Sequence, residues 1–265
     1  MPGTSFRKLI TSTLRLYRVA LAEAFRGTLK NWYVIFFHLL LIAGIAILTP
    51  ILSPLGGMAG GFIMGLILAL VVASYLSTVA AAVENEKIVW PELWPSACAL
   101  FSPTISVLFL FFILSLLATM LFQGAGQTWL IAAVYLLLSV LCNPLPEYIY
   151  VRGGNGIELF KESFEFVKEN FVEWFLPYAV LLFPILLISP ALFVHIGMSL
   201  AINNPLRLVE MIILMLADPA ILLQNTLLLI VFLYLFFFLF VFRGALFKRL
   251  ATSTRRKRMY QELYS

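Results

Sequence analysis

The stretch Asn31–Leu52 reads NWYVIFFHLLLIAGIAILTPIL and contains no lysine, arginine, aspartate or glutamate. A helix of about 20 apolar residues is long enough to cross the hydrocarbon core of a bilayer, which is about 30 Å thick. Five further stretches are similarly apolar: Gly60–Val83, Pro103–Phe122, Gln127–Tyr150, Phe171–His195 and Ile221–Phe242. The sequence therefore predicts an all-α, polytopic integral membrane protein with six transmembrane helices.

The composition of the chain supports the same class. Hydrophobic residues make up 62% and charged residues 12% of the 265 residues, whereas soluble domains have about 45–50% and about 25%. The apolar stretches leave no room for a separate soluble domain, so we expect residues 1–265 to form one membrane domain.

The positive charges predict the orientation. All but one of the 18 lysines and arginines precede the first span, follow spans two and four, or lie in a basic tail at 243–265; Arg207 is the exception. Positive residues remain on the cytoplasmic side of a membrane, so we expect a protein of the cytoplasmic membrane with both termini inside. The net charge of +5 then faces anionic lipid headgroups, which are the expected partners in place of nucleic acid.

A short pattern recurs about every 70 residues. In each copy a glutamate precedes an aromatic residue at the same spacing, and an apolar stretch follows. The three pairs are Glu23 with Trp32, Glu92 with Phe101, and Glu162 with Phe171. Asn31 and Asn170 also match one another, with Leu100 between them in the middle copy.

The recurrence predicts three parallel repeat units, at 5–83, 84–150 and 151–242. Each unit would consist of a cytoplasmic surface helix that leads into a pair of spans. The first surface helix is expected at Ser5–Lys30, lying in the interface with its basic stems reaching toward the headgroups. A soluble arm is the alternative for this segment.

Polar residues near the membrane define a candidate ligand or ion site, because such residues are costly in hydrocarbon. The site comprises His38, Asn143 and Glu147. Pro144 and Pro146 must interrupt helical hydrogen bonding beside it. The structural alternatives are a contact from His38 to Ser74, Ser77 or Thr78, and an ion pair from Glu147 to Arg152 or a basic tail residue.

Two further local expectations concern packing and exposure. Gly61 and Gly65 form a GxxxG motif that permits close helix contact, and we expect it to pack within the chain rather than between chains. Glu173, at the mouth of the fifth span, is expected to face water.

No motif for catalysis is present. The chain lacks a Walker A loop, HExxH, GxSxG and a nucleotide-binding glycine pattern. Cys98 and Cys142 have no second ligand at metal spacing, and a disulfide is not expected in a reducing compartment. We therefore expect no cofactor, no metal and no enzymatic activity.

The segment from Arg152 to Asn170 follows the pattern RGGNGxELxxxSxxxxxxN. On this segment the chain resembles the six-span bacterial and archaeal membrane proteins related to the membrane domain of some glycerophosphodiester phosphodiesterases. The resemblance implies a repeated six-span architecture. The catalytic barrel of the fused family members is absent from this sequence, so the resemblance implies no phosphodiesterase activity.

Three functional classes follow. The leading one is a membrane scaffold or a protein that binds lipids or partners. The alternative is a small permease, or the membrane subunit of a transporter or exporter that receives an ATPase. An intramembrane enzyme is the third and is the least supported, because no paired reactive groups are visible.

Overall fold

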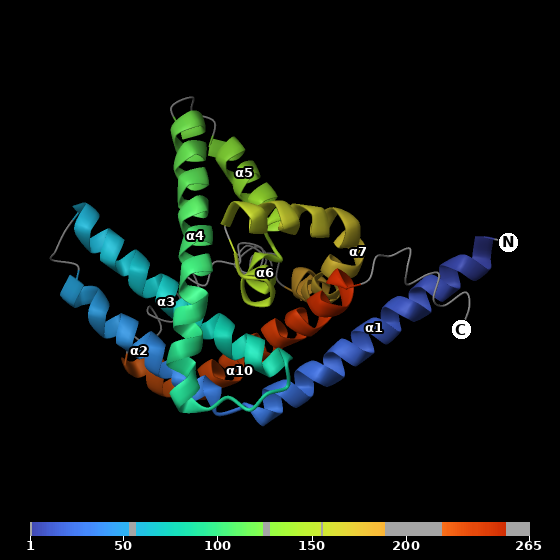
Figure 1. Cartoon of the computed structure of the whole chain (residues 1–265), viewed down its shortest axis with the longest axis horizontal. Helices are drawn as coiled ribbons and strands as arrows, with labels where there is room; N and C mark the ends of the chain where they lie inside the picture. The colour runs from blue at the N-terminus through green and yellow to red at the C-terminus, as the bar shows by residue number, and fades with distance from the viewer. Residues whose placement is uncertain (1, 53–56, 124–127, 155, 189–218, 253–265) are drawn as a thin grey trace.

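The computed structural model describes residues 2–52, 57–123, 128–154, 156–188 and 219–252. Within these ranges every regular element is a helix, which confirms the all-α class. The helices are α1 (Pro2–Lys30), α2 (Val34–Leu52), α3 (Gly57–Val83), α4 (Trp90–Gln123), α5 (Thr128–Leu141), α6 (Leu145–Val151), α7 (Gly156–Ile188) and α10 (Pro219–Ala251) (Figure 1).

Four helical segments of the described chain are long and apolar enough to cross a membrane. They are Val34–Leu52, Gly60–Val83, Trp90–Phe122 and Ala133–Val151. These correspond to the first four predicted spans and support a membrane protein. The predicted fifth and sixth spans are not among them. Phe171–His195 begins in α7 and continues beyond the described residues, and Ile221–Phe242 lies within α10.

Three interruptions shape the helices. A turn at residues 31–33 separates α1 from α2, and another at residues 142–144 separates α5 from α6. Asn170 has a non-helical conformation inside α7, with φ −121° and ψ 20°. The second interruption is the one that Pro144 and Pro146 predict, because proline provides no N–H and clashes with the preceding turn.

No such interruption separates the expected middle surface helix from the third span. Instead α4 is continuous from Trp90 to Gln123, with Pro95 and Pro103 inside it. The position that matches Asn31 and Asn170 is Leu100 in α4. Leucine has no side-chain amide to replace a backbone hydrogen bond, whereas asparagine offers the backbone an alternative partner.

The main core lies where α1, α3, α6, α7 and α10 meet. Large buried side chains such as Leu145, Trp174 and Phe247 belong to one continuous cluster. Helix α1 runs beside α10 (Figure 1). Glu23 is paired with Arg249, and Gly27 lies against Val241, so the two helices are antiparallel.

Close helix contact occurs at different glycines from those expected. A Cβ atom added at Gly61 or Gly65 would meet nothing within 4 Å in the structure as described, so the expected packing of the GxxxG motif within the chain is wrong there. A Cβ atom at Gly27 would instead collide with the carbonyl oxygen of Ala82, and one at Gly244 with Tyr150. The close contacts arise because α1 approaches the end of α3 at Gly27, and α10 approaches it at Gly244.

Candidate functional site

The centre of the candidate site is the break between α5 and α6. Helix α5 ends at Leu141, and α6 begins at Leu145 with Pro144 as its N-cap residue. A helix break leaves backbone carbonyls without helical partners. Here the freed carbonyl of Asn143 accepts a hydrogen bond of 2.7 Å from Nη2 of Arg243, a residue of α10.

Arg243 also forms a bidentate ion pair with Glu147. Its Nε donates to Oε1 of the carboxylate at 2.7 Å, and its Nη2 donates to Oε2 at 2.9 Å. Glu147 is fully buried and Arg243 is 4% exposed. Removing one partner of such a buried pair costs about 3–5 kcal/mol, because the other charge is left uncompensated. Loss of either partner would therefore destabilise the contact between α6 and α10.

Aromatic rings surround the guanidinium group. The Cζ atom of Arg243 lies 5.3 Å from the ring centre of Trp174, 5.1 Å from Phe240 and 5.7 Å from Tyr178. The indole Nε1 of Trp174 donates to Oδ1 of Asn143 at 2.8 Å. Asn143 thus contacts α10 through its backbone and α7 through its side chain, so one residue of the break holds two helices.

The structure brings together two of the three predicted site residues. Asn143 and Glu147 share Arg243, whereas His38 bonds to Thr78 of α3, with 3.2 Å between its Nε2 and the hydroxyl oxygen. Thr78 also donates to the carbonyl of Tyr75 at 2.7 Å, so Nε2 of His38 must be the donor in their contact. The predicted structural contact of His38 is confirmed.

Of the two partners expected for Glu147, the basic tail residue is confirmed, and it is Arg243. Arg243 is the first residue of the predicted basic tail, but α10 continues to Ala251 and buries this arginine. One feature of the sequence singles out Arg243 within the tail. It directly follows the apolar run that ends at Phe242, and Glu147 near the end of the fourth span requires a cationic partner. Arg152, the other expected partner, is paired with Glu162 near the surface.

Glu173 also differs from expectation, because it is 5% exposed rather than facing water. Its backbone carbonyl accepts a 2.7 Å hydrogen bond from the hydroxyl of Tyr17 in α1. Burial, and secondarily the charge of Glu173, raise the pKa of Tyr17 well above its usual value. The contact joins α1 to α7 close to the ion pair.

The six glutamate and aromatic residues of the recurring pattern lie outside this site. Glu23 and Glu162 form ion pairs with Arg249 and Arg152, while Glu92 is exposed in the first turn of α4. Trp32 and Phe171 are more than half exposed.

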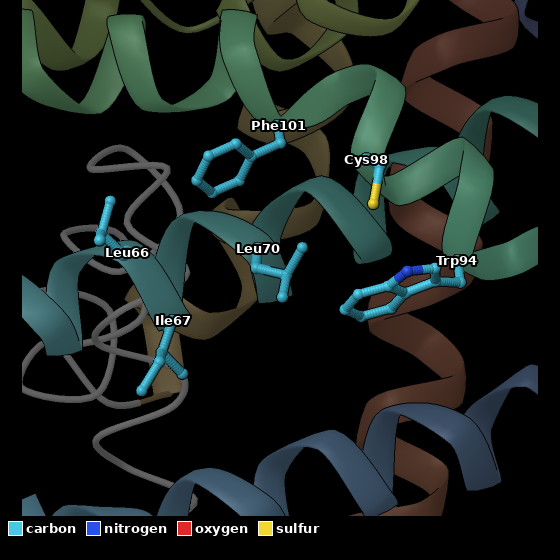
Figure 2. Close-up of a pocket in the computed structure, with 6 residues that line it drawn as sticks. All are labelled: Leu66, Ile67, Leu70, Trp94, Cys98 and Phe101. Carbon is cyan, nitrogen blue, oxygen red and sulfur yellow. The ribbon is translucent and has the colours of Figure 1, made fainter.

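Phe101 lines an apolar groove of about 290 Å³ between α3 and α4. The groove is lined by Leu66, Ile67, Leu70, Trp94, Cys98 and Phe101 (Figure 2). It contains no charged side chain, so it provides space for an apolar group but no recognition chemistry.

The sequence matches no protein-family model, and neither a curated protein nor a solved structure is significantly similar to it. Over the described residues the fold is all-helical and has four candidate membrane spans, which defines the class as a membrane protein. Within the residues that the structure describes, no group of three or more histidine, cysteine or acidic side chains is placed to hold a metal ion.

Proposed function

We propose that this protein is a non-enzymatic scaffold of the cytoplasmic membrane, with six spans and both termini inside. The architecture proposed is that of the membrane proteins that the Arg152–Asn170 segment resembles. The observation that supports the proposal is that Glu147 and Arg243 form a buried, bidentate ion pair. Both carboxylate oxygens accept hydrogen bonds from the same guanidinium group.

A transport or catalytic carboxylate must be able to change partners. Glu147 has no exposed surface, and its partner is also bound to the Asn143 carbonyl and enclosed by aromatic rings. Exchange would require both charges to separate in an apolar environment, where their attraction is strong. The geometry therefore favours a fixed connection that holds the broken fourth span against α10.

The parallel threefold repeat is part of the same proposal. It is supported by Asn31 and Asn170, which are buried at helix breaks in matching positions of the first and third units. In each case an exposed aromatic residue follows, Trp32 or Phe171. Exposed aromatic side chains after a break suit the headgroup level of a membrane.

A small permease, or an exporter subunit that binds an ATPase, is the second candidate. One observation favours it: the hydroxyl oxygens of Tyr75 and Tyr150 are buried without a hydrogen-bond partner in the described part of the chain. Buried polar atoms normally have partners, and a water-filled or substrate-filled passage would supply them. A copurifying ATPase would support this candidate over the scaffold.

Charge removal at the ion pair tests the scaffold proposal. Glu147→Gln and Arg243→Gln should each lower the unfolding temperature and the abundance of the protein, and the charge-free double variant should recover part of the loss. Glu84→Gln is the matched control, because Glu84 pairs with Lys248 in a half-exposed position. If Glu147→Gln leaves stability unchanged but abolishes a transport or growth phenotype, the permease replaces the scaffold.

Cysteine labelling of intact cells tests the topology. Single cysteines at Ser53, Gly124 and Asn203 should react with an impermeant reagent, and those at Asn85 and Ser253 should not. Position 155 is decisive. Labelling of a cysteine at Asn155 from outside the cell would contradict six spans with both termini inside.

A further inference from the structure

Helix α1 has one face that packs on the rest of the protein. Its buried residues on this face are small: Ala20, Ala24, Gly27 and Thr28 are all buried. Small side chains allow close approach of backbones, and here they contact α10 and the end of α3. This face is fully occupied by the protein itself.

A second face of α1 exposes large apolar side chains. At 3.6 residues per turn, positions 14, 18, 21, 25 and 29 lie on one side of the helix. Four of them are apolar and 44–61% exposed: Leu14, Leu21, Phe25 and Leu29. We refer to these four residues as the apolar stripe. Exposed apolar surface of this extent marks a contact with a membrane or a partner.

Three arginines accompany the apolar stripe. Arg18 lies within it, and Arg15 and Arg26 lie along one edge; all three are exposed. In the described residues none of them has an ion pair or a hydrogen bond, whereas the other charges of this part of α1 are used internally. Glu23 binds Arg249, and Lys30 donates to the Asn85 carbonyl at 2.6 Å. The outward face is therefore uniformly positive.

The contacts of α1 place this face on the predicted cytoplasmic side. Asn85 belongs to the loop after the second span, and Glu173, which accepts from Tyr17, lies at the mouth of the fifth. Both positions are cytoplasmic in the proposed topology. The cytoplasmic leaflet has a negative surface potential that attracts basic segments.

We infer that the outward face of α1 is a binding surface for anionic phospholipids. The apolar stripe enters the headgroup region, and the three arginines contact lipid phosphates while their aliphatic stems remain among the apolar side chains. Charge complementarity selects this partner, because the face carries three cations and no free acid. The inference rests on the proposed topology, and it extends the scaffold proposal by naming the lipid class and its site.

Environment-sensitive fluorescence of the full chain tests the inference. The variant Leu21→Cys, in a Cys98→Ser background, is labelled with a nitrobenzoxadiazole dye and reconstituted in vesicles. One set contains phosphatidylcholine alone, and the other contains equal parts of phosphatidylcholine and phosphatidylglycerol. We expect blue-shifted emission and quenching by brominated lipid in the second set. Near an anionic surface each arginine is worth about a fivefold change in affinity.

The combined variant Arg15→Gln, Arg18→Gln, Arg26→Gln should lose the preference for phosphatidylglycerol. The matched control replaces three exposed lysines elsewhere, Lys87, Lys161 and Lys168, with glutamine, and should retain it. Equal quenching in both vesicle types would overturn the anionic-lipid site. A water-exposed dye in both would also overturn it and would indicate a protein partner. In either case the unfolding and labelling results at Glu147 and Asn155 decide the scaffold proposal separately.

Discussion

Asn31 and Asn170 make the same contact at two separate helix breaks. Each donates from Nδ2 to the backbone carbonyl four residues earlier, Asn31 to Gly27 at 3.0 Å and Asn170 to Phe166 at 3.2 Å. At Asn31 the side-chain amide takes the place that the backbone N–H would occupy in a continuous helix, because that N–H bonds to the carbonyl of Thr28 instead. The chain can therefore turn at Asn31 without leaving the Gly27 carbonyl unsatisfied.

Asn31 is held by further hydrogen bonds, and these give the first prediction. Asn31 also donates to the carbonyl of Glu86 at 2.9 Å and accepts from the N–H of Ile88 at 3.0 Å. Asn31→Ala should leave several buried groups unpaired, at about 1–3 kcal/mol each. Thermal unfolding in detergent measures the loss, and a destabilisation below about 1 kcal/mol would contradict the network at Asn31.

The second prediction concerns the shape of the cation at residue 243. Arg243→Lys keeps the charge but loses the planar fork that binds Glu147 and the Asn143 carbonyl together. We expect destabilisation of about 2 kcal/mol or more, because at least one buried partner loses its bond. Arg152→Lys is the control: its side chain is 63% exposed, and surface pairs contribute only about 0–1 kcal/mol. A similar small effect at both positions would show that charge alone matters.

The third prediction separates the two partners of the His38 contact. Thr78→Val leaves the Nε2–H of His38 buried without its acceptor, at a cost of about 1–3 kcal/mol. His38→Phe removes the donor instead, and the new ring can pack against Tyr75, 4.8 Å from the present imidazole. We expect a smaller loss for His38→Phe than for Thr78→Val. The reverse order of unfolding temperatures would assign His38 a role beyond this contact.

The fourth prediction compares two glycines. Gly27→Ala would force a Cβ atom against the Ala82 carbonyl, so α1 must move away from α3. Crowding of this kind typically costs about 1–3 kcal/mol. Gly61→Ala meets open space and replaces a poor helix former with a good one, so stability should be unchanged or slightly higher. Loss of stability at Gly61 would indicate that a neighbour packs there.

Short-range features could be predicted from the sequence alone. The helical class and the four candidate spans of the described residues follow from the length and apolarity of segments such as Asn31–Leu52, because both properties depend on residues that are neighbours in the sequence. Pro144 and Pro146 predicted the break in the fourth span for the same reason: each removes a backbone donor wherever the chain packs. The match between Asn31 and Asn170 was also visible in the sequence.

Only the tertiary structure decided which distant groups meet. Glu147 and Arg243 are 96 residues apart in the chain, and only the packing of α10 beside α6 decides which of the expected basic residues pairs with Glu147. The same holds for α1, whose small face binds α10 while its apolar stripe stays exposed. Hydrophobic patterning specifies that a surface is apolar, but packing determines whether protein or another partner covers it.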